Sequence, residues 1–177
     1  GLGSSSVTKV AAAGSTNYAA TYGGLSISTN GGSSWTNYTT AQGLGDNQVN
    51  GVAVSGATIY AATYGGGLSV SANGGSSWTN YTTTQGLVSN YIYGVAVSGS
   101  TIAAATYNGL SVSTNGGSSW TTYTTTQGLV SNLVKGVAVS GSTIAAATNG
   151  GGLSVSTNGG SSWTNYTTTQ GLGHYQV

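Results

Sequence analysis

Cysteine, proline, methionine and phenylalanine are absent from this 177-residue chain. The lack of cysteine excludes disulfides and thiolate metal sites, although it leaves the cellular compartment open. The lack of methionine, in a chain that begins at Gly1, predicts a processed or excised segment. Because no apolar run reaches the roughly 18 residues of a membrane-spanning helix, we expect no membrane insertion.

Charged side chains are almost as scarce. Lys9 and Lys135 are the only cations, Asp46 is the only carboxylate, and His174 is the only imidazole. We therefore expect no nucleic-acid binding, because phosphate neutralisation needs several Lys or Arg side chains. Abundant Ser, Thr, Gly and Asn with so little charge predicts a secreted or cell-surface polypeptide, and no cofactor is expected.

One octapeptide recurs four times: three copies read S-T-N-G-G-S-S-W and one reads S-A-N-G-G-S-S-W. Its last residue is spaced by 43, 42 and 43 residues from copy to copy. Such a period is typical of propeller blades or other stacked units, because one unit cannot bury its apolar face alone. The predicted repeats, which form a single domain over 1–177, are 1–42, 43–85, 86–127 and 128–170, with 171–177 starting a fifth copy or forming a closing strap.

Each repeat contains four short segments with the alternation of β-strands. In the second copy these segments are G-V-A-V-S, T-I-Y-A-A-T, G-L-S-V-S and W-T-N-Y-T-T, with turn residues between them. The pattern predicts an all-β fold, a β-propeller of four-stranded antiparallel blades. The first segment carries the smallest residues, so we expect it to lie innermost, and no segment is predicted to be a helix.

The octapeptide itself predicts a tight turn. Asn30 is expected to tolerate a left-handed backbone and to bond its own main chain two residues on, while Gly31 and Gly32 supply positive φ. Trp35 is expected to cover the turn with its apolar face. The residues assigned to the four turns are Ser28, Asn30, Gly32, Ser34, Trp35, Ser71, Asn73, Gly75, Ser77, Trp78, Ser113, Asn115, Gly117, Ser119, Trp120, Ser156, Asn158, Gly160, Ser162 and Trp163.

These turn residues resemble the Asp-box, S-x-D-x-G-x-[ST]-W, of sialidase-like and sortilin-like propellers. The departure is Asn in place of Asp in every copy, which removes the carboxylate. The stretch Gly86–Leu110 resembles the propeller repeat of two-component-regulator sensors; the usual aromatic near its centre is kept as Tyr18 and Tyr60 but becomes alanine in the last two copies. In the Asp-box families the box is a structural turn far from the catalytic face, so both resemblances imply a fold and no activity.

Catalysis is not expected. The sialidase resemblance implies an arginine cluster, a Tyr–Glu nucleophile pair and an acidic proton donor, whereas this chain has no Arg and no Glu. Two-carboxylate glycoside hydrolysis is excluded because Asp46 is the only acid. A Ser–His–Asp arrangement would have to use His174 with Asp46, and one His with one Asp makes no metal-ligand cluster.

Carbohydrate is the ligand that the composition favours. Tyr22, Tyr64 and Tyr107 occupy equivalent positions in the turn after A-A-T, and Asn149 stands there in the fourth copy. Amphipathic tyrosine rings stack on sugar faces while neighbouring amides bond hydroxyls. The alternative, which general burial habits favour, is that these tyrosines cover the seams between blades.

Two functions follow from the same repeats. The first is a structural or self-assembling extracellular module, supported by the depleted charge and by the seven-residue overhang. The alternative is a multivalent lectin-like binder that gains avidity from repeated weak sites. Three arrangements also stay open: a closed four-bladed ring, slightly favoured, a segment of a longer array, and an edge offered to a neighbouring chain.

Overall fold

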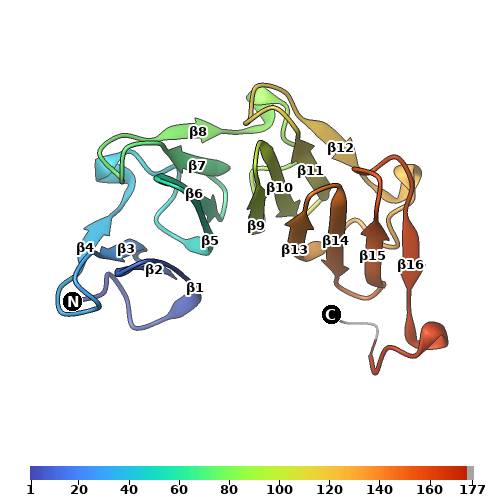
Figure 1. Cartoon of the computed structure of the whole chain (residues 1–177), viewed down its shortest axis with the longest axis horizontal. Coiled ribbons are helices and arrows are strands. Elements are labelled where there is room, and N and C mark those ends of the chain that lie inside the picture. The colour runs from blue at the N-terminus through green and yellow to red at the C-terminus, as the bar shows by residue number, and fades with distance from the viewer. Residues whose placement is uncertain (175–177) are drawn as a thin grey trace.

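The computed structural model describes residues 1–174, and all of its sheets are four-stranded and antiparallel. Each repeat forms one such blade, as predicted, and the blades follow one another along an arc (Figure 1). Blade 1 holds β1 (Val7–Ala13), β2 (Thr16–Thr21), β3 (Gly24–Ser28) and β4 (Thr36–Tyr38), and blade 2 holds β5 (Val49–Ser55), β6 (Thr58–Thr63), β7 (Leu68–Ser71) and β8 (Thr79–Tyr81). Blade 3 holds β9 (Ile92–Ser98), β10 (Thr101–Thr106), β11 (Gly109–Ser113) and β12 (Thr121–Tyr123), and blade 4 holds β13 (Val134–Ser140), β14 (Thr143–Thr148), β15 (Gly152–Ser156) and β16 (Thr164–Tyr166).

The first strand of each blade lies innermost, which confirms the prediction from its small residues. β1 packs beside β5, β5 beside β9, and β9 beside β13. Glycines permit this approach: a Cβ on Gly51 would stand 3.2 Å from the Cα of Gly94. Among residues 1–174, β13 and β1 are not a packed pair, and the arc stays open between them (Figure 1). The favoured closed ring is therefore not the arrangement of this chain.

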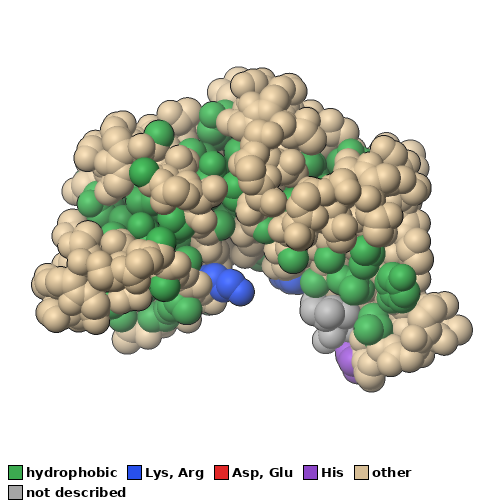
Figure 2. Space-filling model, in the orientation of Figure 1, with side chains coloured by type: hydrophobic (Ala, Val, Ile, Leu, Met, Phe, Trp, Pro, Cys, Tyr) green, Lys and Arg blue, Asp and Glu red, His purple; other side chains and the backbone are tan. Residues whose placement is uncertain are grey.

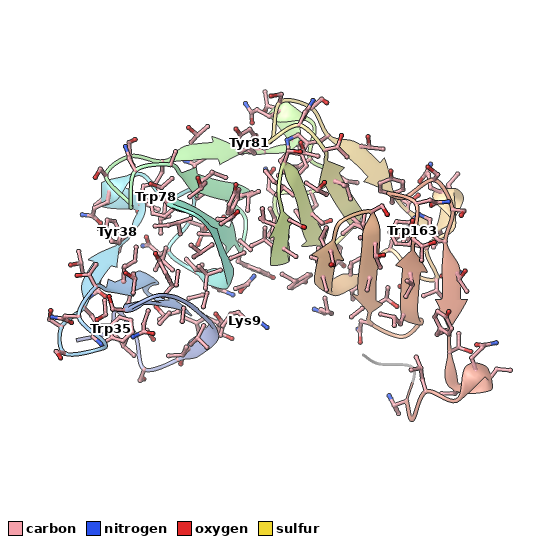
Figure 3. The ribbon with its side chains drawn as sticks, in the orientation of Figure 1. Lys9, Trp35, Tyr38, Trp78, Tyr81 and Trp163 are labelled. Carbon is pink, nitrogen blue, oxygen red and sulfur yellow. The ribbon has the colours of Figure 1, made fainter. Side chains whose placement is uncertain are left out.

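Three seams, one between each pair of neighbouring blades, hold the apolar core. The seam between blades 1 and 2 buries Leu25 and Ile27 against Ile59 and Val52. The same positions recur at the other two seams, in clusters that contain Leu68 with Ile102 and Leu110 with Ile144. Each seam is completed by an edge-to-face pair that joins a tyrosine of one blade to the tryptophan of the next: Tyr38–Trp78, Tyr81–Trp120 and Tyr123–Trp163 (Figure 3).

The octapeptide turns are built as a closed hydrogen-bond cluster. In the first copy the Asn30 side-chain oxygen accepts the backbone N–H of Ser34 at 2.9 Å, and its amide group donates to the Ser34 hydroxyl at 2.8 Å. The backbone bond thus reaches four residues on, which corrects the predicted span of two. Gly31 and Gly32 have φ of 68° and 96°, as predicted. Asn30, which we expected to tolerate a left-handed backbone, does not adopt one, because within residues 1–174 only glycines take positive φ.

Four short 3₁₀ turns contradict the prediction that the chain has no helix. They are Thr40–Gln42, Thr83–Gln85, Thr125–Gln127 and Thr168–Gln170. Each is closed by a capping box; in the second, Thr82 accepts the Thr84 N–H and the Gln85 side chain accepts the Thr82 N–H. The prediction failed because three residues are too few to show a helical period.

Candidate functional site

A β-bulge opens the innermost strand of every blade at the same register. In blade 2, Val49 pairs with Thr63 and Gly51 pairs with Ala62, so Asn50 between them has no partner in the ladder. The unpaired residues of the four bulges are Thr8, Asn50, Tyr93 and Lys135. Bulges re-aim a side chain out of the regular alternation, and they are over-represented beside functional sites. Here all four residues line one hollow of about 240 Å³ along the inner edge of the arc.

Two of the four bulge residues tie neighbouring blades together. The hydroxyl of Thr8 donates to the carbonyl of Val49 at 2.7 Å, and the amide of Asn50 donates to the carbonyl of Ile92 at 2.8 Å. Each bond runs from one innermost strand to the next. These two side chains therefore have a structural role at the axis, whatever else they contact.

The other two bulge residues form a cation–π pair. The Lys135 ammonium lies 3.6 Å from the centroid of the Tyr93 ring. Lys9 lines the same hollow from β1, where the other three blades have glycine, and projects into the open middle of the arc (Figure 3). Figure 2 shows lysine side chains on either side of the opening at this inner edge. Both cations of the chain therefore face one space.

A second hollow, of about 310 Å³, is lined by Tyr64, Tyr91 and Tyr107. Their exposed fractions are 42%, 47% and 55%, although aromatic rings of this size are ordinarily well covered. Tyr64 and Tyr91 meet edge to face with ring centroids 5.1 Å apart. Tyr64 also forms an isolated bridge with Tyr91, in the segment that leads into blade 3. The turn after β6 has one more glycine than the turn after β2.

The two hollows lie close together, because Tyr91 of the tyrosine hollow and Tyr93 of the axial hollow are two residues apart in the chain. The backbone N–H of Tyr107 also donates to the Tyr91 carbonyl at 3.1 Å. Burial raises the pKa of Tyr93, and the nearby Tyr107 hydroxyl raises the same pKa further. Tyr107 belongs to the tyrosine hollow and Tyr93 to the axial one. The exposed tyrosines of blades 2 and 3 therefore stand near the Tyr93–Lys135 pair at the axis.

The predicted ligand contacts separate into two groups. Tyr64 and Tyr107 come together, whereas Tyr22 (57% exposed) and Asn149 lie on blades 1 and 4 and do not line the tyrosine hollow. Among residues 1–174, the aromatic pairs that complete the seams use Tyr38, Tyr81 and Tyr123, while Tyr64 alone of the four predicted contacts meets an aromatic ring of the next blade, that of Tyr91. Trp78, Trp120 and Trp163 complete the seams, whereas Trp35 lies at the uncovered end of blade 1.

Sequence reasoning missed the bulge residues and Tyr91. The available signal was divergence between copies that otherwise match closely: one position reads Thr8, Asn50, Tyr93 and Lys135, and another reads Ser6, Gln48, Tyr91 and Leu133. The structure collects these two variable positions on the innermost strands and on the segments that lead into them.

The only carboxylate borders the tyrosine hollow without being among its lining residues. A Cβ on Gly65 would stand 3.6 Å from an Asp46 side-chain oxygen and 3.7 Å from the Tyr91 ring. The Asp46 carboxylate accepts the backbone N–H of Gln48 at 2.8 Å. Within residues 1–174, no three His, Cys, Asp or Glu side chains are grouped as metal ligands. No helix in that range is long and apolar enough to cross a membrane.

The arrangement of the blades is that of a β-propeller, and comparison with solved structures agrees. The chain is similar to the extracellular domain of a protein described as a hybrid two component system from B. thetaiotaomicron, with a TM-score of 0.81 and 18% identity over 96% of this chain and 24% of that one. It is similar to an ancestral GH74 enzyme, with a TM-score of 0.73 and 27% identity over 92% of this chain and 24% of that one.

A GH74 enzyme from Niastella koreensis gives a TM-score of 0.63 and 28% identity, again over 24% of its length. The chain thus spans about a quarter of the length of these proteins. No protein-family model matches the chain, and no curated protein matches it. The comparisons therefore establish propeller repeats without placing the chain in a family.

Proposed function

We propose that this chain is a non-catalytic extracellular structural module whose copies join head to tail, the last blade of one copy against the first blade of the next. One observation carries the proposal: the two sheet faces at the ends of the arc present positions that the three internal seams bury. Large exposed apolar faces on a soluble protein mark interaction sites.

The free face of blade 4 repeats the buried half of a seam. Leu153, Val155 and Tyr166 stand where blade 3 has Leu110, Val112 and Tyr123. Leu110 and Val112 are 0% and 2% exposed because blade 4 covers them. Tyr166 is 40% exposed, since no blade follows it within the described residues.

The free face of blade 1 supplies the opposite half. Leu2, Val7 and Val10 are 40%, 43% and 66% exposed. Their counterparts at the first seam, Leu44, Val49 and Val52, are 3%, 0% and 5% exposed. Asn17, however, stands where the other blades have a buried isoleucine. A joint between copies would bury less apolar surface than an internal seam, so we expect it to be weaker and reversible.

The internal seams also indicate the contacts of this joint. Tyr166 of one copy would pack on Gly32 and meet Trp35 of the next, as Tyr38 packs on Gly75 and meets Trp78. A head-to-tail joint of this kind closes into a ring or continues as a filament, depending on its rotation. Similarity to a domain described as extracellular supports a secreted or cell-surface location. Multivalent carbohydrate binding is the second candidate function, favoured by the exposed tyrosines of the middle blades.

Light scattering over a hundredfold dilution series tests the proposal. We expect a molar mass above 17.2 kDa that falls on dilution. Val10→Glu places a charge on the free face of blade 1 and should leave a monomer with unchanged circular dichroism. Thr114→Glu, at an exposed turn off both end faces, is the matched control and should assemble normally. A 17.2 kDa species at every concentration would overturn the proposal, as would assembly that Val10→Glu leaves intact.

A further inference from the structure

We infer that the middle of the arc binds an acidic oligosaccharide, whose sugar rings lie on the exposed tyrosines of blades 2 and 3 and whose carboxylate is held by the lysines at the axis. None of the tyrosines involved lies on the end faces of the arc. The inference therefore goes beyond self-assembly and does not depend on it.

The tyrosine hollow has the character of a sugar platform. Tyr64, Tyr91 and Tyr107 are about half exposed and belong to two neighbouring blades, so their rings form one concave surface. The Tyr64–Tyr91 edge-to-face contact restricts both rings before any ligand binds. Rings of this kind offer large contact area at a small cost in conformational entropy, while their hydroxyls stay available to hydroxyl-rich ligands.

The axial hollow adds a positive charge to one end of this platform. Lys135 is exposed but held over the Tyr93 ring, so its ammonium is positioned without an ionic partner among the residues lining the hollow. Lys9 lines the same space. Because charged residues are so rare in this chain, the field of these two lysines is not cancelled by a surrounding mixture of charges.

The residues assign the charge of the ligand as well as its type. A neutral sugar would use the tyrosines and leave both lysines without a role in binding. A nucleic acid would need more cations than two to neutralise its phosphates. A sugar polymer carrying carboxylates at intervals satisfies both parts of the surface, since apolar sugar faces meet the rings and one carboxylate meets the ammonium groups.

The β-bulges explain how the repeat accommodates this site. In a regular strand, successive side chains point to opposite faces of the sheet, so Tyr93 and Lys135 would point to the faces that pack in the seams. The one-residue bulge takes both side chains out of that alternation and directs them toward the axis. The site is thus placed on the rigid innermost strands without disturbing the core positions of either blade.

Titration with oligogalacturonate tests the inference, and its fully methyl-esterified form is the matched neutral ligand. Isothermal calorimetry at low salt should show binding of the acid form at least about tenfold tighter than the ester. Added salt should remove most of that difference, because screening weakens the contribution of exposed lysines. The double variant Lys9→Gln/Lys135→Gln should bind the two forms equally.

The tyrosines are tested with a control that the chain provides. Tyr107→Ala should weaken binding of both the acid and the ester by about tenfold or more. Tyr22→Ala removes an equally exposed tyrosine at the equivalent turn of blade 1 and should leave binding unchanged. Equal binding of acid and ester by the unmodified chain, or no binding of either, would overturn the inference. So would equal effects of Tyr107→Ala and Tyr22→Ala.

Discussion

The ring of Tyr38 packs against the backbone of Gly75, one blade further along the chain. A Cβ on Gly75 would lie 2.8 Å from two atoms of that ring, and the φ of Gly75 is 96°. Tyr81 has the same relationship to Gly117. The second glycine of the N-G-G turn therefore has two separate requirements, positive φ and room for the tyrosine of the preceding blade.

The first blade separates these two requirements. Gly32 also has a φ of 96°, but no tyrosine packs on it. Gly32→Ala should cost about 1 kcal/mol of unfolding free energy from backbone strain alone. Gly75→Ala should cost a further 1 to 3 kcal/mol, roughly, because it also overfills the seam. Urea denaturation measures both variants, and equal losses would contradict the packing role.

Trp120 provides a second prediction. Its ring meets Tyr81 edge to face at 5.8 Å, and its indole N–H is buried with no acceptor among the described residues. Trp120→Ala should lose about 3 to 5 kcal/mol of unfolding free energy, because a large seam side chain is removed. Trp120→Phe should lose only about 1 kcal/mol, because it keeps an aromatic ring and removes an unpaired donor. Trp35→Ala, at the uncovered end, is the control and should lose less than Trp120→Ala.

Substitutions of the turn asparagine test whether the turn depends on its hydrogen-bond geometry or on the charge at this position. Asn115 accepts the Ser119 N–H at 2.9 Å and donates to the Ser119 hydroxyl at 2.9 Å. Asn115→Ala should lose about 1 to 2 kcal/mol on denaturation, since it removes both bonds and the one that the Asn115 oxygen accepts from the Ser113 hydroxyl. Asn115→Asp keeps the acceptor, and the serine hydroxyl can rotate to donate, so the expected loss is below about 0.5 kcal/mol. A loss in Asn115→Asp equal to that in Asn115→Ala would show that the amide is required.

Alkaline pH should destabilise the fold. Burial raises the pKa of Tyr60 and of Tyr123, so the folded chain holds these phenolic protons more tightly than the unfolded chain does. The free energy of unfolding is therefore at its full value below the ordinary tyrosine pKa of about 10 and decreases as pH rises through the higher folded-state values. Denaturation between about pH 8 and pH 11 measures the decrease. It should be smaller in Tyr60→Phe, which removes one of the three tyrosines whose pKa is raised, the third being Tyr93.

The blades were predictable because their signals are local and repeated. Strand alternation, the N-G-G turn and the small residues of the innermost strand each act within one repeat, and all were found in place. The capping boxes around Thr82 and Gln85 were also readable as T-x-x-Q, but three residues carry no period. The Asn30 bond differed in span because two consecutive glycines extend the turn by two residues beyond an ordinary Asx-turn.

The open arc and the candidate site were not predictable from such signals. Closure depends on the angle at each seam, which is set by the packing of side chains such as Leu68 and Ile102 rather than by any one repeat. At Tyr93 the pairing of β9 with β10 shifts by one residue. The side chains on both sides of this shift alternate in the same way along the sequence, so the pattern of alternation does not reveal the bulge. Only the comparison of copies marks the position.

The bulge also makes the axial position replaceable. Threonine, asparagine, tyrosine and lysine occupy it in turn, and the ladders on either side of it keep the same pairing in all four blades. Thr8 and Asn50 bond the next innermost strand, whereas Tyr93 and Lys135 pair with each other, so recognition can diversify at these last two positions while the ladders are copied unchanged. A protein engineer could rewrite those two side chains and expect the same arc to carry a different specificity.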